Sequence, residues 1–171
     1  AGPAPTRPAE LDLHNVYFSS DYEREFRQLF GDRESPDEPT VYVFAPEPQS
    51  ADGAPLFALV NAPANGDRVA WDARLVDRAR RAAVATFERC GSALTLDGFE
   101  ATTPTDFHLR FPGTGGALYG PAMHGWRAAF RRPGSRTGVA GLYLAGGSAH
   151  PGSGVPMAAL SGRIAAGSIL E

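Results

Sequence analysis

The segment best suited to chemistry in this chain is Gly146-Gly147-Ser148-Ala149-His150-Pro151-Gly152-Ser153-Gly154. Its glycines tolerate positive φ and let a ligand approach the backbone closely. The apolar run at 142–145 predicts a buried strand before it, and Pro156 predicts a helix start after it. The first N–H groups of a helix lack internal partners and lie at the positive end of its dipole. Together these features predict a site for a phosphate or for the carbonyl of a cofactor ring.

Two other interpretations of this segment stay open from the pattern alone. Glycines often serve only to reverse the chain, so a structural turn is the first alternative. Ser148 lies between the expected strand and helix, where a hydrolase places its nucleophile. However, His150 stands where the G-x-S-x-G motif has its last glycine. A Walker-type phosphate loop is excluded, because no G-K-[ST] occurs in the chain.

The other reactive residue types exclude several classes of site. The 16 residues counted as Lys or Arg are all arginines, so no lysine Schiff base or lysine nucleophile can form in this chain. Cys90 is the one cysteine, which excludes an internal disulfide and a cysteine zinc site. The histidines, His14, His108, His124 and His150, lack the spacing of metal ligands. His150 lies in the glycine-rich turn and is a candidate donor to a cofactor or substrate, with a structural hydrogen bond as the alternative.

Length and composition predict a globular piece of one or two domains. The chain has 171 residues, is 43% hydrophobic and carries a net charge of −3, so we expect no nucleic-acid partner. No apolar run reaches the ~20 residues that span a bilayer, and no signal peptide is visible. Residues 1–10 start with Ala1 rather than Met and are rich in proline, so we expect a flexible segment at the start of a fragment.

Hydrophobic periodicity predicts the elements that must position the turn. We expect strands at 14–19, 40–44 and 56–60, the last two joined as a hairpin by the loop 45–55. A helix over 22–30 is expected to start at Ser20-Asp21, to end at Gly31 and to carry Tyr22, Phe26, Leu29 and Phe30 on one face. The longest expected helix covers 72–89 and closes at Cys90-Gly91. Turns are also expected at 65–67 and at 131–134, and a helix is expected to start at 104–107. We further expect an extended stretch at 94–103, an irregular segment at 113–120 and a short apolar segment at 126–130.

The segment 142–163 resembles the C-terminal signature of the phytoene-desaturase-like carotenoid desaturases, within the FAD-dependent amine oxidase superfamily. In that family a strand ending in glycine, a His-Pro-Gly-x-Gly loop and a helix beginning at Val-Pro contact FAD. The matching residues are 142–147, His150-Pro151-Gly152-Ser153-Gly154-Val155-Pro156-Met157 and Ser161-Gly162-Arg163. The likeness covers nearly all of the chain after Leu13. Its upstream motifs are His14-Asn15-Val16-Tyr17-Phe18-Ser19-Ser20-Asp21-Tyr22, residues 39–43, residues 59–65, residues 103–107, residues 116–120, His124-Gly125 and Arg132-Pro133-Gly134. The chain is most similar to the hydroxyneurosporene or methoxyneurosporene dehydrogenase type, the 1-hydroxycarotenoid 3,4-desaturases.

This resemblance implies an α/β fold, as an α+β fragment. The fragment would be the C-terminal part of a Rossmann-like FAD/NAD(P)-binding flavoprotein that has a mixed-sheet substrate domain. Residues 11–111 would supply part of the substrate-binding domain, and residues 112–171 the C-terminal part of the FAD-binding domain. His150 is a weak catalytic candidate by resemblance, and no metal is implied. The implied FAD contacts are Gly146, Gly147, Ser148, His150, Pro151, Gly152, Gly154, Val155, Pro156 and Met157.

The activity implied for the whole enzyme is FAD-dependent desaturation of a C–C bond in a carotenoid, in carotenoid biosynthesis. The substrate would be a hydroxylated or methoxylated neurosporene-type polyene, and the enzyme would be cytoplasmic and peripheral to the inner membrane. The alternatives are a non-catalytic truncated or fold-completing subunit, and a related flavin isomerase or amine oxidase. An oligomeric state is not implied.

The chain departs from the family pattern in two places. Many members have an acidic residue after the last strand, where this chain has Gly147-Ser148. The dinucleotide motif G-x-G-x-x-G is absent from the sequence. We therefore expect the isolated chain to bind no FAD and to be inactive.

Several aromatic residues are candidates for lining a channel for an apolar substrate, although the general tendency of aromatic residues predicts core positions for most of them. They are Phe18, Phe26, Phe30, Phe44, Phe57 and Trp71.

Overall fold

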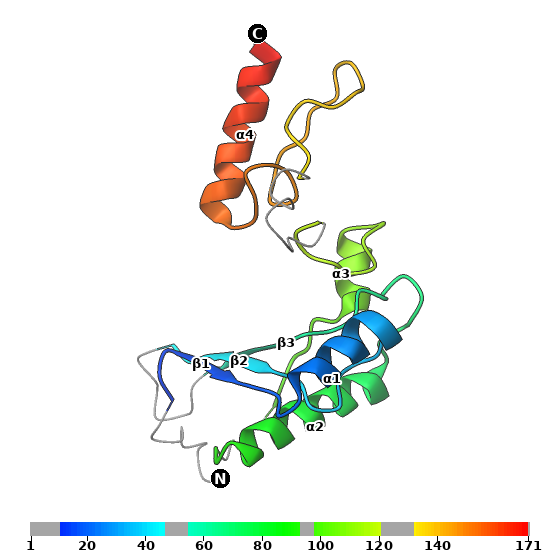
Figure 1. The fold of residues 1–171 in the computed structure, drawn as a ribbon, viewed down its shortest axis with the longest axis vertical. Coiled ribbons are helices and arrows are strands. Elements are labelled where there is room, and N and C mark those ends of the chain that lie inside the picture. Colours follow the sequence, from blue (N-terminus) through cyan, green and yellow to red (C-terminus); the bar gives the residue numbers. More distant parts are fainter. Residues whose placement is uncertain (1–10, 47–54, 93–97, 121–131, 171) are drawn as a thin grey trace. The chain divides into compact units, whose positions relative to one another are not determined.

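The computed structural model describes residues 11–46, 55–92, 98–120 and 132–170 (Figure 1). The chain divides into two compact units, Ala1–Gly116 and Ala117–Glu171, which we call unit 1 and unit 2 and describe separately. The expected flexible segment at 1–10 and the apolar piece at 126–130 lie outside the described residues. So do most of the loop 45–55, residues 94–97 of the extended stretch 94–103 and the first residue of the turn 131–134.

Unit 1 is built on a three-stranded antiparallel sheet. Its strands are β1 (His14–Tyr17), β2 (Val41–Phe44) and β3 (Phe57–Val60), in the order β1-β2-β3. The register places Tyr17 and Val60 opposite Val41 on either side of it. All three predicted strands and the predicted hairpin are therefore confirmed, and the chain combines helices with a small antiparallel sheet.

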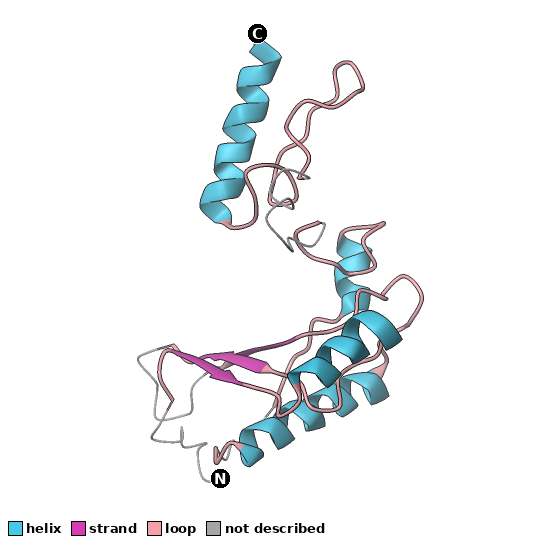
Figure 2. Ribbon diagram, viewed as in Figure 1, coloured by secondary structure: helices cyan, strands magenta, loops and turns pink. Residues whose placement is uncertain are grey.

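The helix α2 (Ala73–Arg89) packs on one face of this sheet, as Figures 1 and 2 show. Val41 and Val43 of β2 are fully buried against Phe87 of α2 and form the core of unit 1. The Asp72 carboxylate accepts a hydrogen bond from the Leu75 N–H and caps the helix. The predicted helix and its end at Cys90 are confirmed. Burial of each of these core side chains contributes about 1.5–3 kcal/mol.

The first predicted helix is confirmed at its start but not at its end. It consists of α1 (Tyr22–Phe26), capped by Asp21, followed by the π-helical turn η1 (Arg27–Asp32). The prediction that Gly31 ends it is wrong. The wider π turn carries the chain to Arg33, which has φ 56°, and the Glu34 N–H then donates to the Gln28 carbonyl.

Tyr22, Phe26 and Phe30 share one side of this helix, as predicted, and their tilted rings have centroids 4.8 and 5.5 Å apart. That side is exposed, whereas Leu29 is buried. The buried side chain of α1 is instead Glu25, which is 1% exposed.

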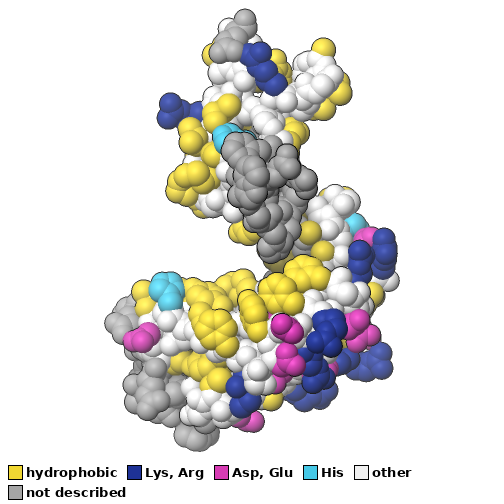
Figure 3. Space-filling model, viewed as in Figure 1, with side chains coloured by type: hydrophobic (Ala, Val, Ile, Leu, Met, Phe, Trp, Pro, Cys, Tyr) yellow, Lys and Arg dark blue, Asp and Glu magenta, His cyan; other side chains and the backbone are white. Residues whose placement is uncertain are grey.

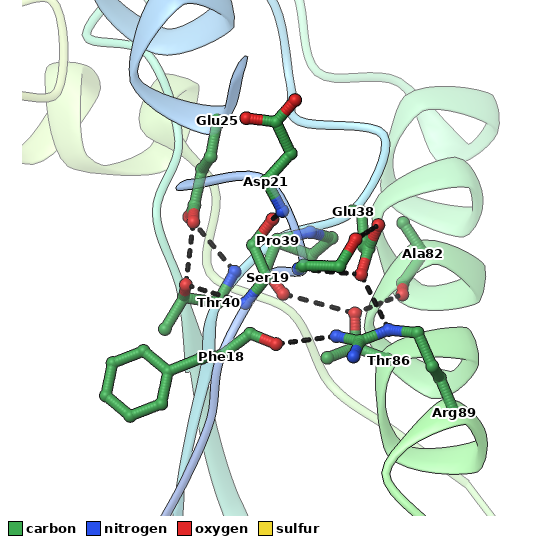
Figure 4. Close-up of polar contacts among 11 residues, drawn as sticks. Phe18, Ser19, Asp21, Glu25, Glu38, Pro39, Thr40, Ala82, Thr86 and Arg89 are labelled. Atoms are coloured by element: carbon green, nitrogen blue, oxygen red, sulfur yellow. Dashed lines mark hydrogen bonds and ion pairs between the residues drawn. The ribbon is translucent and has the colours of Figure 1, made fainter. Parts of the chain in front are cut away.

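A polar network ties both helices to the segment that precedes β2 (Figure 4). Glu25 accepts hydrogen bonds from the Thr40 N–H at 3.0 Å and the Thr40 hydroxyl at 2.6 Å. From α2, Arg89 pairs with Glu38 at 2.6 Å and donates to the Phe18 carbonyl at 2.5 Å. Hydrogen bonds from Ser20, helped by Arg89, hold the pKa of Glu38 below its usual value. These contacts fasten α1 and α2 to the sheet.

Asp37 makes a second connection between the two helices of unit 1. Its carboxylate pairs with Arg24 of α1 at 2.7 Å and with Arg78 of α2 at 2.9 Å, and it also accepts from the Gln28 amide. The hydrogen bond from Gln28, followed by the bond from Arg78, lowers the pKa of Asp37 from its ordinary value of 3.8.

Glycines explain how α3 (Pro104–Arg110) joins the rest of unit 1. The Thr103 side chain and Asp106 form a reciprocal cap at its start, which confirms the predicted helix start. A Cβ on Gly66 or Gly116 would lie 2.2 or 2.4 Å from the Pro104 carbonyl oxygen. Gly66, in the predicted turn at 65–67, and Gly116, in the irregular segment 113–120, therefore permit close packing against α3.

Unit 2 contains α4 (Val155–Leu170) beside loop segments (Figure 2). The predicted helix after the glycine-rich turn is confirmed. The predicted buried strand at 142–145 is wrong. Among the described residues of unit 2, it forms only an isolated antiparallel bridge between Tyr143 and Arg136, and Leu142 is 50% exposed. A strand requires a continuous hydrogen-bonded partner, and the segment 135–144 supplies that at one point only.

Candidate functional site

The glycine-rich turn of unit 2 presents open backbone. Gly146, Gly152 and Gly154 have φ of 117°, 148° and 103°, a region that side-chain-bearing residues rarely adopt. No heavy atom lies within 4 Å of the point where a Cβ would stand on any of these three glycines. Their open side is therefore not filled by side chains of the described residues, and a ligand could approach the backbone there.

Residues from outside the turn hold it in this conformation. The Gly146 N–H donates to the hydroxyl of Ser161, which is fully buried on α4. Arg132 donates to the Gly147 carbonyl at 2.5 Å, and the His150 N–H donates to the Pro133 carbonyl at 2.8 Å. The turn is thus fixed to α4 on one side and to the Arg132-Pro133 segment on the other.

Two further polar atoms are buried near these contacts. The Arg132 Nε and the Ser135 hydroxyl are shielded from solvent and make no hydrogen bond to any described residue. An unsatisfied buried donor costs about 1–3 kcal/mol, so this corner of unit 2 favours an additional acceptor.

The predicted site residues come together because they are contiguous. Gly146 to Gly154 form the turn, with a cis peptide bond between His150 and Pro151, and Val155, Pro156 and Met157 form the first turn of α4. The Ala158 N–H is bonded to the Gly154 carbonyl, so it belongs to the helix. The backbone N–H groups before Ala158 have no carbonyl partner inside the helix, so they can donate to a ligand. They lie at the positive end of the helix dipole. Val155, which is 85% exposed, leaves this helix start uncovered.

The structure provides no nucleophile–base pair at the turn. Within the described residues, no hydrogen bond joins Ser148 to His150, and both residues are exposed. Gly120, at φ 71°, instead packs its backbone against the Ser148 side chain. The hydrolase alternative therefore lacks the contact that its chemistry requires.

The histidines of the described segments are dispersed. His14 bonds to Tyr42 in the sheet, and His108 accepts from the Gly115 N–H, whereas His124 lies outside the described residues. Over residues 11–46, 55–92, 98–120 and 132–170, no three His, Cys, Asp or Glu side chains gather as metal ligands would.

Unit 1 exposes a second candidate surface, on the face of the sheet opposite α2. Figure 3 shows hydrophobic side chains gathered over the strands and α1. We call this surface the open sheet face. In Figure 4 the ring of Phe18, which continues β1, points away from α2. The register and the side-chain alternation of the strands place these residues on it: His14, Val16, Tyr42, Phe44, Phe57 and Leu59.

The expectation that most of the candidate aromatics are core residues is wrong. Phe18, Phe26, Phe30 and Phe57 are exposed, and Phe44 is half-buried. Trp71 is half-buried too, and its indole donates to the Asn65 side chain.

In the parts of the chain that the structure describes, no helix has both the length and the apolar character needed to cross a lipid bilayer.

Sequence reasoning found the turn but missed the groups that hold it. The sequence pattern places Ser161 and Arg132 within motifs of the family likeness and gives neither residue a partner. The available signal was that both residues lie in the segments carrying the family likeness. Their partners, 15 residues away in each case, cannot be read from local patterns.

Comparison with known proteins identifies the family pattern over nearly the whole chain. The model of the flavin containing amine oxidoreductases matches residues 15–170. Hydroxyneurosporene desaturase of Rubrivivax gelatinosus is 48% identical over 94% of this chain and 32% of its own length. Hydroxyneurosporene desaturase of Rhodobacter capsulatus is 40% identical over 95% of the chain and 34% of its own length. The 1-hydroxycarotenoid 3,4-desaturase of a Flavobacterium species is 34% identical over 92% of the chain. The chain thus spans about a third of the length of these relatives.

Proposed function

This chain belongs to the family of flavin containing amine oxidoreductases, and on that premise we propose that it is part of an FAD-dependent carotenoid desaturase. The observation that carries the proposal is the open glycine turn at the start of α4, since no described atom lies within 4 Å of the point where a Cβ would stand on Gly146, Gly152 or Gly154. We assign residues 112–171 to the flavin-binding domain and residues 11–111 to the substrate-binding domain.

The residues of the turn fit a flavin. A planar ring with carbonyl groups needs backbone donors and close approach without side chains, and Gly146, Gly152 and Gly154 supply that access. Val155, Pro156 and Met157 would lie beside the ring at the start of α4, with Gly147, Ser148, His150 and Pro151 along the turn. Arg132 would act through the Gly147 carbonyl as a positioning residue.

The chain's own contribution to the reaction is electrostatic and geometric. When bound, FAD supplies the acceptor for the hydride that leaves the substrate carbon, while the second hydrogen leaves as a proton. The N–H groups at the start of α4 would donate to a ring carbonyl, whose negative charge grows during reduction. The side-chain-free turn would let these donors reach the ring, and the bonds to Ser161 and Arg132 would keep them in place.

The proposed substrate is a neurosporene-type carotenoid that carries a hydroxyl or methoxy group. Support comes from the relatives, which are named hydroxyneurosporene desaturase and 1-hydroxycarotenoid 3,4-desaturase, and from the open sheet face, which offers exposed hydrocarbon such as Val16, Phe57 and Leu59 to an apolar molecule. Because a carotenoid is dissolved in lipid, we propose that the complete enzyme works in the cytoplasm at the periphery of the inner membrane.

The decisive experiment uses the product of the complete coding sequence, which we call the complete protein. It is purified, its FAD content is measured, and it is incubated with a hydroxylated neurosporene-type carotenoid in detergent. Desaturation lengthens the conjugated system, so the expected result is a red shift of the carotenoid spectrum together with stoichiometric FAD. A protein that carries FAD but leaves every carotenoid spectrum unchanged, while oxidising an amine, would assign the chain to an amine oxidase instead.

A further inference from the structure

The open sheet face is apolar except at one point, where two polar side chains bond to each other. His14 Nδ1 lies 2.8 Å from the Tyr42 hydroxyl. The pair stands among hydrocarbon side chains: Phe44 is 5.3 Å from the His14 ring, and Phe57 and Leu59 continue the face on β3. We propose that His14 and Tyr42 recognise the hydroxyl group of a hydroxylated polyene that lies on this face, an assignment that rests on the proposed function.

The register of the sheet explains why the two polar groups meet. His14 stands opposite Phe44, and Tyr42 stands opposite Val16, so His14 and Tyr42 are diagonal neighbours on adjacent strands. Their rings are nearly parallel, with an interplanar angle of 21° and centroids 6.1 Å apart. The hydrogen bond to Tyr42 uses Nδ1 of the His14 imidazole. Its Nε2 therefore remains as a second polar atom on the open sheet face.

Covering this face with a ligand removes water from both groups. Four of the six side chains on the face, Val16, Phe44, Phe57 and Leu59, are hydrocarbon and gain from contact with any apolar chain. His14 Nε2 and the Tyr42 hydroxyl would instead lose their solvent partners. A plain hydrocarbon cannot replace those bonds, whereas a hydroxyl group both donates and accepts. Sites of this kind select the hydroxylated ligand mainly by penalising the analogue that lacks the group.

The test compares two polyenes of equal length and unsaturation, one with and one without a terminal hydroxyl, competing for the complete FAD-loaded protein. The readout is the ratio of the two kcat/KM values. We expect the wild type to favour the hydroxylated polyene about tenfold, and Tyr42→Phe to reduce that preference about five- to tenfold, mainly through faster use of the polyene that lacks the hydroxyl. His14→Leu removes the other half of the pair and is expected to act in the same direction.

Tyr17→Phe is the matched control. Its hydroxyl lies on the opposite side of the sheet and bonds to the Ser92 hydroxyl at 3.2 Å, so its removal is expected to leave the ratio unchanged. A preference that is the same in wild type, Tyr42→Phe and His14→Leu would overturn the recognition while leaving the desaturase proposal intact. If the wild type desaturates neither polyene, the proposed function fails first. Unaltered FAD content in each variant shows that a changed ratio does not come from misfolding.

Discussion

Replacement of Gly154 tests the flavin site most directly. The residue has φ 103°, and an added Cβ would meet no atom within 4 Å. A single methyl group there therefore creates no clash with the described residues, and its cost is backbone strain of about 1–3 kcal/mol. If the FAD-bound form requires this conformation, Gly154→Ala is expected to raise the Kd for FAD by about 5- to 150-fold. Gly154→Leu places a branched side chain on the open side and is expected to abolish binding.

The assay is titration of the deflavinated complete protein with FAD, followed by flavin fluorescence. Gly167→Ala is the control, because Gly167 lies within α4 and also has no neighbour within 4 Å of its Cβ position. That change should leave the Kd unaltered and stabilise the helix by about 0.5–1 kcal/mol. If Gly154→Leu binds FAD as tightly as the wild type, the turn does not face the flavin and the assignment of its residues is refuted.

Three other changes have outcomes that follow from single contacts. Arg132→Leu removes a charged donor from the Gly147 carbonyl and is expected to weaken FAD binding about tenfold in the same titration. Glu25→Ala removes a buried acceptor and is expected to lower the free energy of unfolding by about 3 kcal/mol in urea. Asp37→Asn is expected to cost less than about 1 kcal/mol, since the pair is largely exposed. Because folding lowers the pKa of Asp37 from 3.8, its contribution is present above pH 3.8 and disappears as the pH falls through the folded-state pKa.

Each of these three changes has a control on the same element or near it. Arg163→Leu on the exposed side of α4 should not affect FAD affinity. Glu23→Ala alters an exposed carboxylate of α1 and should change the free energy of unfolding by less than about 0.5 kcal/mol. Asp32→Asn provides the exposed reference for the acid titration. A difference between wild type and Asp37→Asn that grows on acidification would contradict the sign derived above.

Elements whose ends are marked by capping chemistry could be predicted from the sequence. The helices expected over 72–89 and from 104 start where predicted, and the structure shows Asp72 capping α2 and Thr103 capping α3. In such cases the signal is local, because the side chain that ends the helix is within three residues of the group it binds.

Glu25 shows where periodicity is insufficient. The apolar spacing of Tyr22, Phe26 and Phe30 correctly predicts that they share one side of α1, but it does not show that the buried side chain of this helix is Glu25. The reason is a pair of hydrogen bonds from Thr40, which lies 15 residues away. A buried carboxylate is stable only with such partners, and a one-dimensional pattern does not contain them.

The strand expected at 142–145 failed for a related reason. Its apolar composition is suited to a sheet interior, but a strand forms only when neighbouring backbone accepts and donates in register. Among the described residues, Arg136 provides one bridge to Tyr143, and the Leu144 N–H bonds to the Ser135 carbonyl. The turn that follows was nevertheless predicted correctly, because glycine conformations depend on the local backbone and not on the sheet.

The two exposed surfaces differ in the chemistry that would satisfy them. Val16, Phe57 and Leu59 are 50%, 57% and 47% exposed, and complete burial of such side chains is worth about 1.5–3 kcal/mol each. A hydrocarbon that covers that face therefore gains several kcal/mol of binding free energy, whereas a phosphate gains almost none. The turn before α4 offers the reverse, namely backbone donors and a helix dipole that favour a polar ring carbonyl. The proposed function assigns a polar cofactor to the turn and an apolar polyene to the sheet face, and each surface by itself suits that ligand, whereas a polar ester or a phosphate would leave the hydrocarbon of the sheet face uncovered.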